Sequence, residues 1–516
     1  MVALLARIET WIMLALGFSS GLPILLVYST LSTWLYEAGV DVKVIGWFSL
    51  VGLTFGFKFL WAPLIDRLPC PWLSRRLGHR RGWLLAAQLA LAVSLVQMGF
   101  LNPLTADAHA PIAPSFIYGA LIIAISSATQ DIVIDAVRVE LAEPEIQAWL
   151  AGVYVAGYRV GMIVAGAGAL FLATRLGSTQ AQYSLGAWQG TYLVMAAFTL
   201  VGIATTFWTK EPRYTTPPEV HPHRDYGLVI GVFAAALTTF FVAYTGVLST
   251  LGQSLDGLLL DSDATKFRRA VVGFISGSVR FFGAVGLAGL VGVTLARLPM
   301  APKALLRASF VTPFADLLTR YGRATILIVL VIGTYRLTDV VMGVLANPFY
   351  IQTGFTKDEI ATVTKLFGLV ITIFGGFVGG WLTKRQGIYF GMWVGGLLAA
   401  LTNVAFSWLA NLGPQLYGLY VAIGVDNLAG GMASAAFVAF LSALTNRAFT
   451  ATQYASLFAL TAIFPKIVAA KSGEWVTLMG YSQFFAMTAV LGLPTLVFLW
   501  RLNVRRPDLM GSELPR

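Results

Sequence analysis

Charged residues are scarce in this sequence of 516 residues. They make up 11% of the chain, whereas an ordinary soluble domain carries about 25%. Hydrophobic residues make up 57%. A water-soluble protein of this size needs a more highly charged surface, so the apolar excess must face lipid, which excludes most classes of soluble enzyme.

Cysteine and histidine are also rare. Cys70 has no second cysteine with which to form an internal disulfide, and the four histidines lie in polar connecting stretches without metal-ligand spacing. The sequence therefore gives no indication of a metal site, thiol chemistry or a bound cofactor.

Long apolar runs, by contrast, are abundant. Fourteen runs have the length of about 20 residues that an α-helix needs to cross a bilayer. They lack the alternation of β-barrel strands and predict an all-α transmembrane fold. The first run is too long for a signal peptide and is expected to be retained. The predicted spans are residues 12–36, 45–65, 83–101, 114–138, 149–173, 188–208, 227–250, 271–296, 324–346, 361–383, 388–409, 414–442, 452–472 and 482–500.

The lysines and arginines predict the orientation. With the N-terminus inside, twenty-two of the 35 fall in cytoplasmic segments and seven in outside segments. The positive-inside rule then places both termini in the cytoplasm. The net charge of +11 follows mainly from this topology and from attraction to anionic headgroups, so we expect membrane lipid and no nucleic acid as a partner.

Two spans, 227–250 and 271–296, separate six spans from six others. Two six-helix halves joined by a long cytoplasmic connector resemble the layout of major facilitator transporters. Apolar residues at helical spacing also predict an amphipathic cytoplasmic helix at 303–320. The expected parts are an N-terminal bundle (1–208), a linker with the inserted hairpin (209–322), a C-terminal bundle (323–500) and a basic tail (501–516).

Ten charged residues fall inside the predicted spans, apart from Arg138 and Lys471 at span ends. A charge at a helix centre costs about 2.5 to 3.5 kcal/mol by insertion scales, so these residues must face one another or a wet cavity. They are therefore the first candidates for function. The cations are Lys58, Arg159, Arg280, Arg336, Lys365 and Lys466, and the acids are Asp131, Asp135, Asp339 and Asp426.

The spacing of the acids favours proton coupling. Asp131 and Asp135 share a helix face, and two carboxylates in a low-dielectric site do not readily ionise together, so one of them can hold a proton. The alternative for Asp135 is a structural ion pair with Arg138, and Arg336 can pair in the same way with Asp339. The proton-coupling candidates are Asp131, Asp135, Asp339 and Asp426.

The cations suit an anionic ligand, because guanidinium and ammonium groups pair with carboxylate or phosphate. Polar and aromatic side chains at similar depth add hydrogen bonds and stacking surfaces for sugar rings, although aromatic residues in spans often face lipid instead. The candidate substrate-binding residues are Tyr28, Lys58, Gln130, Tyr158, Arg159, Arg336, Lys365, Asn427 and Lys466.

Two further motifs have two interpretations each. In GFSSGLP, Gly17, Gly21 and Pro23 can bend the first span beside a cavity, or the glycines can serve helix packing. The loop LIDRLPCPWLSRRLGHRRG can form a charge latch on the cytoplasmic side, or it can simply follow the positive-inside rule. The candidate latch residues are Asp66, Arg67, Arg80 and Arg81.

Several of these strings closely resemble the AmpG muropeptide permeases. They are GFSSGLP, IGWFSLVGLTFGFKFLWAPLIDR, RRGWLLAAQ, SSATQDIVIDA, GYRVGM, WQGTYLVMAAF, DNLAGGMASAAFVAFLSALTN and ATQYASLFAL. The resemblance implies a major facilitator protein of the Gram-negative inner membrane. It further implies proton-driven import of N-acetylglucosamine-1,6-anhydro-N-acetylmuramic acid, with or without peptide, for peptidoglycan recycling and β-lactamase induction.

The family motifs match this sequence at most of the candidate residues. Arg336 and Lys466 lie in less well matched stretches, and some members of the family have no paired insertion like the hairpin at 227–296. The resemblance therefore implies no exact role for these three features. The positions that match are Lys58, Gln130, Asp131, Asp135, Arg159, Asp339, Lys365, Asp426 and Asn427.

Two other hypotheses remain open at this point. One is a facilitator of the same fold that carries another amphipathic anion, such as a siderophore or a pigment precursor. The other is a membrane-embedded transferase or hydrolase with Asp131 and Asp135 as acid and base, which no motif supports. We expect a monomeric secondary transporter rather than an enzyme.

Overall fold

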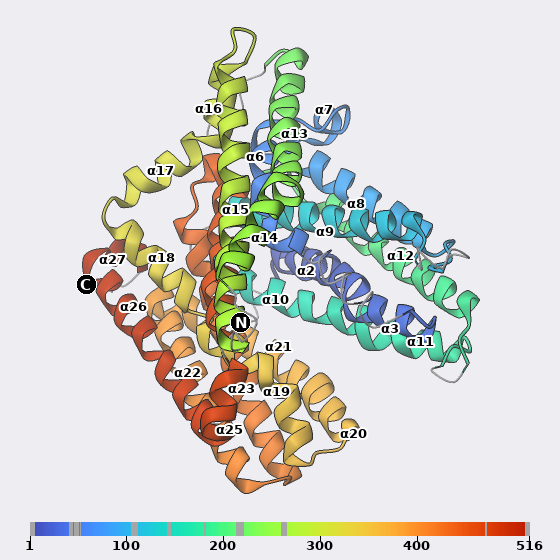
Figure 1. Cartoon of the computed structure of the whole chain (residues 1–516), viewed down its shortest axis with the longest axis vertical. Coiled ribbons are helices and arrows are strands. Elements are labelled where there is room, and N and C mark those ends of the chain that lie inside the picture. The colour runs from blue at the N-terminus through green and yellow to red at the C-terminus, as the bar shows by residue number, and fades with distance from the viewer. Residues whose placement is uncertain are drawn as a thin grey trace. The chain divides into compact units, whose positions relative to one another are not determined.

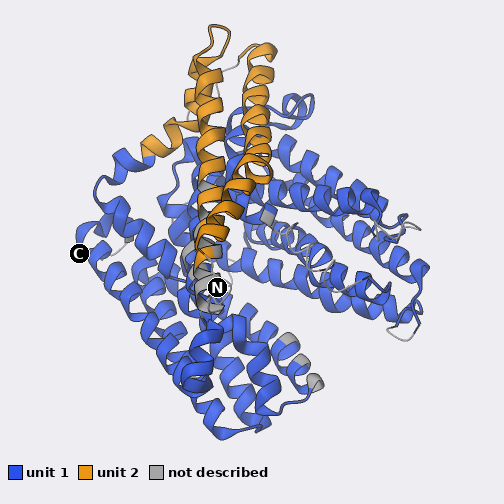
Figure 2. Cartoon of the chain, viewed as in Figure 1, with its two compact units in different colours: residues 1–216, 317–516 blue, residues 217–316 orange. Residues whose placement is uncertain are grey.

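The computed structural model of the chain describes residues 6–40, 45, 51, 53–104, 112–141, 146–179, 182–212, 221–259, 266–469 and 472–510. Helices account for nearly all of this part of the chain (Figure 1). They form two compact units, residues 1–216 with 317–516, and residues 217–316 (Figure 2). The first unit contains both predicted bundles, and the second contains the inserted hairpin.

The N-terminal bundle is built around two long helices that pack against each other, α2 and α10. The helix α2 also contacts α9 and α12, and α8 lies against α9 and α12. The helices are α2 (Ile8–Val27), α3 (Ser29–Glu37), α5 (Leu53–Phe57), the 3-10 helix η2 (Lys58–Leu60), α6 (Ala62–Arg67), α7 (Leu73–Leu77), α8 (His79–Met98), α9 (Pro114–Leu141), α10 (Gln147–Ile163), the π-helical turn η4 (Val164–Gly168), α11 (Ala169–Arg175) and α12 (Leu185–Trp208).

The C-terminal bundle is built around α23, which packs against α21 and α22. Outside this layer, α25 covers α22, and α18 contacts α24 and α26. The helices are α18 (Ala324–Thr334), α19 (Leu337–Thr353), α20 (Lys357–Ile360), the π-helix η5 (Ala361–Phe367), α21 (Gly368–Gln386), α22 (Ile388–Leu412), α23 (Leu416–Leu444), the 3-10 helix η6 (Arg447–Phe449), α24 (Thr450–Ala469), α25 (Ser472–Leu491), α26 (Leu493–Arg505) and α27 (Pro507–Met510).

Within the described residues, twelve helical segments are long and apolar enough to cross a membrane. Each coincides with one of the fourteen predicted spans. Of the other two, the span at 45–65 lies partly outside the described residues, and the one at 452–472 corresponds to α24, which is not among the twelve. The all-α membrane fold is confirmed, whereas the count of fourteen stays a prediction.

The glycines of the first span serve helix packing and do not bend the helix. A Cβ atom at Gly17 would lie 2.3 Å from the Tyr154 carbonyl oxygen, and one at Gly21 would lie 2.0 Å from that of Tyr158. These glycines therefore let α2 lie directly against the backbone of α10. The break between α2 and α3 comes later, at Tyr28, where φ is −112° and ψ is −103°.

The second unit is a helical hairpin with a broken first arm. Its helices are α13 (His223–Thr245), α14 (Val247–Leu259), α15 (Lys266–Arg297) and α16 (Lys303–Phe310). Arg280 on α15 lies over the Tyr244 ring at 4.8 Å and donates to the Tyr244 carbonyl oxygen at 3.2 Å, so this cation is held at the end of α13. The predicted amphipathic helix at 303–320 consists of two helices, α16 and α17 (Thr312–Tyr321), which are separated at Val311.

The two bundles meet through glycines on α10 and α21. A Cβ atom at Gly152 would lie 2.5 Å from the Gly376 carbonyl oxygen, and one at Gly380 would lie 2.8 Å from that of Ala148. By the predicted orientation, these contacts lie toward the cytoplasmic ends of both helices. The glycines therefore bring the bundles into backbone contact on that side.

We expect Gly152→Ala to lower thermal stability, because the new methyl group meets backbone and overpacking costs about 1 to 3 kcal/mol. Gly430→Ala is the matched control, since it also lies in a long helix and a Cβ atom there would meet nothing within 4 Å. Helix propensity makes that control neutral or stabilising by up to about 1 kcal/mol. Melting of the purified variants in one detergent tests this, and equal shifts for both would contradict it.

Candidate functional site

A buried lysine on η2 faces two carboxylates of α9. The Lys58 Nζ atom lies 3.4 Å from an Asp135 carboxylate oxygen and 4.0 Å from an Asp131 carboxylate oxygen. All three residues are buried, with 5 to 7% of their surface exposed. Two carboxylates this close in a buried site do not readily ionise together, so the cluster remains a candidate for holding a proton.

The helix α2 supplies hydroxyl groups to the same cluster. Ser20 donates to Asp131 and lies 2.9 Å from the Tyr154 hydroxyl of α10. One residue earlier, the Ser19 hydroxyl donates to the Gln130 side-chain oxygen at 3.1 Å, and the Gln130 amide donates back to the Ser19 carbonyl oxygen at 2.9 Å. Gln130 thus fixes α2 against α9, which orients Ser20 toward Asp131.

Arg138 extends the cluster into the C-terminal bundle. It pairs with Asp135 at 3.3 Å, as the spacing predicted, and donates to the Ser442 hydroxyl of α23 at 2.6 Å. Its guanidinium also lies over the Tyr454 ring at 5.0 Å. Arg138 has no exposed surface. Asp135 therefore belongs both to the Lys58 cluster and to a contact between the bundles.

A second charged group lies in the C-terminal bundle, where α18 gives way to α19. Arg336 occupies the break, with φ −103° and ψ 13°, and its guanidinium lies 3.8 Å from the Asp339 carboxylate. The side chains are 39% and 28% exposed, so this pair is less buried than the Lys58 cluster. Asp426 on α23 accepts from Thr402 at 3.0 Å and lies close enough to Asp339 for their charges to interact.

The remaining binding candidates fall into two groups. Tyr28, Tyr158 and Arg159 are partly exposed; Tyr28 packs on Phe55, and Arg159 is close enough to Arg336 for their charges to repel. Arg159 and Arg336 thus place two cations where the bundles face each other. The structure gives less support to a binding role for Asn427, Lys466 and Lys365.

Asn427 accepts from Thr372 at 2.6 Å and donates to the Ile423 carbonyl oxygen at 2.9 Å, so its amide groups are used in contacts within and between helices. Lys466 is exposed and is not part of either charged group. The side chain of Lys365 lies outside the described residues, although its backbone belongs to the π-helix η5.

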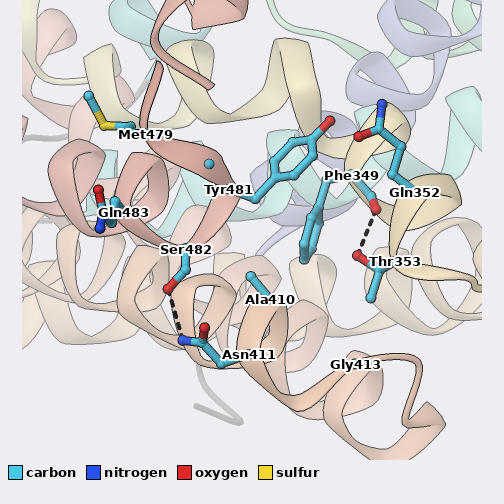
Figure 3. Close-up of a pocket in the computed structure, with 11 residues that line it drawn as sticks. Phe349, Gln352, Thr353, Ala410, Asn411, Gly413, Met479, Tyr481, Ser482 and Gln483 are labelled. Carbon is cyan, nitrogen blue, oxygen red and sulfur yellow. Dashed lines mark hydrogen bonds between the residues drawn. The ribbon is translucent and has the colours of Figure 1, made fainter. Parts of the chain in front are cut away.

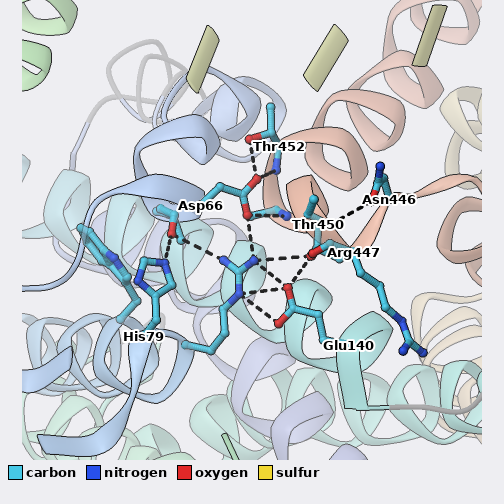
Figure 4. Close-up of polar contacts among 12 residues, drawn as sticks. Asp66, His79, Glu140, Asn446, Arg447, Thr450 and Thr452 are labelled. Carbon is cyan, nitrogen blue, oxygen red and sulfur yellow. Dashed lines mark hydrogen bonds and ion pairs between the residues drawn. The ribbon is translucent and has the colours of Figure 1, made fainter. Parts of the chain in front are cut away.

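Asp66 and Arg80 form the centre of a network of ion pairs within the N-terminal bundle that is hydrogen-bonded to the C-terminal bundle (Figure 4). Arg80 pairs with Asp66 at 2.8 Å and with Glu140 of α9 at 2.6 Å. Asp66 also accepts the backbone N–H groups of Ala451 at 3.0 Å and Thr452 at 2.7 Å. These are the first turn of α24, where free N–H groups and the helix dipole favour an anion.

The other two latch candidates act differently from each other. The Arg67 guanidinium lies over the Phe449 ring of the C-terminal bundle at 4.8 Å. Arg81 stays within its own bundle, where it donates to the carbonyl oxygens of Thr206 at 3.1 Å and Phe207 at 3.2 Å. Three of the four candidates therefore bridge the bundles, and the end predicted to be cytoplasmic is closed.

Glu211, which the sequence did not single out, supports this network. It accepts the backbone N–H groups of Arg80 at 2.8 Å and Arg81 at 3.1 Å, and so caps α8. Burial raises the pKa of the Glu211 carboxyl. Glu211 and the hydroxyl-bearing residues of the Lys58 cluster and of the Arg80 network are common residue types in polar or small-residue stretches. Composition therefore did not indicate a functional role for them. The residues missed in this way are Ser19, Ser20, Glu140, Tyr154, Glu211, Thr402, Ser442, Thr450 and Thr452.

Two helical bundles joined at one end by hydrogen bonds from buried charged residues are typical of a membrane transporter built from two halves. The chain belongs to the Major Facilitator Superfamily, whose family model matches residues 12–334, and within it to the AmpG permeases. It is therefore a transporter and not an enzyme, and a multi-pass protein of the inner membrane.

Known relatives agree over nearly the whole chain. It is 32% identical to the anhydromuropeptide permease of Escherichia coli K12, covering 95% of this chain and 78% of that one. It is 31% identical to a transporter named AmpG 4 of Rickettsia conorii, covering 95% of each. The proton:xylose symporter XylE matches the structure with a TM-score of 0.59 at 13% identity, over 96% of this chain and 94% of that one.

Proposed function

We propose that this chain imports anhydro-muropeptides from the periplasm to the cytoplasm, driven by the proton gradient. The observation that supports the proposal is the buried cluster of Lys58, Asp131 and Asp135, whose two close carboxylates suit the uptake and release of a proton. The name of the Escherichia coli relative, a permease for anhydromuropeptides, supports the substrate. The process served is peptidoglycan recycling, together with the signal that induces β-lactamase.

The two charged groups have complementary roles in this proposal. Arg159 and Arg336 are partly exposed and bind the carboxylates of the peptide or of the lactyl group. The Lys58 cluster is buried and couples binding to protonation. Because Arg138 ties Asp135 to Ser442 across the bundles, a change of charge in the cluster alters the contact that must open for release.

Uptake of labelled anhydro-muropeptide into right-side-out and inside-out vesicles with an imposed pH gradient tests the proposal. We expect substrate to accumulate only when the proton gradient is directed into the vesicle lumen. Accumulation that does not depend on the gradient would exclude proton coupling. Accumulation of a siderophore or pigment precursor in place of the muropeptide would favour the alternative substrate class.

We expect Arg159→Ala to lose more affinity for carboxylate-bearing muropeptides than for neutral sugars. A charge-assisted hydrogen bond contributes about 1.5 to 3 kcal/mol, which corresponds to a loss of roughly 10-fold to 100-fold in affinity. Arg175→Ala is the control, because Arg175 is an exposed arginine that lies over the Phe171 ring at 5.0 Å. Calorimetric titration separates the two ligands, and equal losses for both would count against direct pairing.

A further inference from the structure

The C-terminal bundle contains a pocket of about 560 Å³ that is separate from the charged groups (Figure 3). It lies between the last turns of α19 and α22 and a kink in α25. The kink is at Gly480, whose φ of 76° and ψ of 166° are outside the range that other residues readily adopt. By the predicted orientation, these helix ends face the periplasm.

Glycine is needed at the kink for its backbone conformation and not because a side chain would clash there. A Cβ atom at Gly480 would meet nothing within 4 Å, so the glycine is needed for its left-handed conformation. An unbroken α-helix would continue its regular turns through this point and present no concave face. The pocket therefore exists because the chain interrupts α25 beside the ends of two other helices.

The lining of the pocket is polar and aromatic but uncharged. All eleven residues that line it are described, and none is Asp, Glu, Lys, Arg or His. Amide groups come from Gln352, Asn411 and Gln483, and an aromatic ring comes from Tyr481. Amides donate and accept hydrogen bonds, and flat rings stack on the apolar faces of sugars. An anionic headgroup or a peptide carboxylate would find no cation among these residues.

The walls are held in place before any ligand arrives. Asn411 donates to the Ser482 hydroxyl at 2.8 Å, which joins α22 to α25. Phe349 is 1% exposed, and its ring centre lies 5.1 Å from that of Tyr481 and 4.8 Å from that of Phe485. A pocket with fixed walls loses little conformational freedom on binding, which favours recognition of a rigid ring.

Two of the three walls also contact the charged group of this bundle. Asp339 lies on α19 below Phe349, and Thr402, which donates to Asp426 at 3.0 Å, lies on α22 below Asn411. Tyr350, next to Phe349 in the chain, is close enough to Asp426 for electrostatic interaction. The pocket is therefore attached to α19, which carries Asp339, and to α22, which donates a hydrogen bond to Asp426 of α23.

We propose that this pocket is a binding site for neutral amino sugars. It recognises N-acetylated sugar rings through amide hydrogen bonds and stacking on Tyr481, with no charged contact. That the sugar belongs to a muropeptide rests on the proposed function, but binding of a neutral sugar does not. The site receives the sugar end of a ligand at the periplasmic surface, outside the charged groups.

Titration of N,N′-diacetylchitobiose, a neutral disaccharide of N-acetylglucosamine, into the full chain in nanodiscs tests the proposal. We expect Asn411→Ala and Gln352→Ala each to weaken binding about fivefold to tenfold, in line with the loss of one or two neutral hydrogen bonds. Gln352 and Asn411 are exposed, so these variants are expected to fold. Tyr417→Ala is the control, because Tyr417 is an exposed tyrosine beside Trp408 that does not line the pocket.

The outcomes separate this proposal from the proposed function. Absence of disaccharide binding to the native chain, or unchanged affinity in both pocket variants, would overturn the site. Loss of disaccharide binding in Arg159→Ala alone would place the sugar at the charged groups and would also overturn it. Pocket-dependent binding together with a failure to take up muropeptides would uphold the site and refute the proposed function.

Discussion

Asp131→Asn is expected to abolish concentrative uptake while substrate binding and exchange survive. The asparagine keeps the shape of the side chain and can still accept from Ser20, but it cannot take up and release a proton. Lys58 and Arg138 then face Asp135 as the one remaining carboxylate of the cluster, at 3.4 and 3.3 Å. Uptake driven by a pH gradient should fall to the level of vesicles without the protein.

The matched control is Asp508→Asn, which makes the same chemical change at an exposed carboxylate paired with Arg506. It should leave accumulation unchanged. Exchange of labelled for unlabelled substrate across the membrane, measured without a gradient, shows whether Asp131→Asn still binds and translocates. Undiminished concentrative uptake by Asp131→Asn would exclude this residue as the coupling site.

Arg80→Gln is expected to open the end of the protein that is predicted to be cytoplasmic. The change leaves Asp66 and Glu140 buried without their cation, and breaking a buried ion pair from one side costs about 3 to 5 kcal/mol. Arg80 also donates to Thr450 of the C-terminal bundle at 3.4 Å, and each 1.4 kcal/mol of the cost that falls on the closed state lowers the population of that state about tenfold. The bundles should then rest apart at this end, and net uptake should fall.

Distances between spin labels at positions 76 and 447, on the two bundles, measure this opening. The native Cys70 is replaced by serine in all variants so that labelling is specific. Arg81→Gln is the control, because Arg81 is the neighbouring arginine and contacts only its own bundle. The account requires a longer distance in Arg80→Gln than in Arg81→Gln. Identical distance distributions would show that the network does not hold the closed state.

The sequence predicted the fold and most charged positions because lysine and aspartate are conspicuous within apolar runs. It also predicted pairs that are close in the chain, such as Asp135 with Arg138, since helical geometry fixes their spacing. Lys58 with Asp135 could not be derived in this way. The two residues lie on different helices, and only the packing of η2 against α9 brings them together.

Other features lacked a local signal for physical reasons. The break at Arg336 contains no glycine or proline, so the apolar run reads as one continuous span. The serines of GFSSGLP are ordinary small residues until α2 packs on α9 and α10. Lys466 was predicted to bind substrate but is exposed. The sequence shows that a cation lies in a span but not which way its side chain points, and it can point away from the bundle interior.

The most direct test of proton-coupled import follows protons and substrate in the same proteoliposomes. Anhydro-muropeptide is added from outside without an imposed gradient, and a pH-sensitive dye records proton movement while labelled substrate is counted. Proton coupling predicts that the native chain carries protons inward together with substrate and that Asp131→Asn produces no proton movement when substrate is added. Substrate entry without any accompanying proton movement would contradict the account.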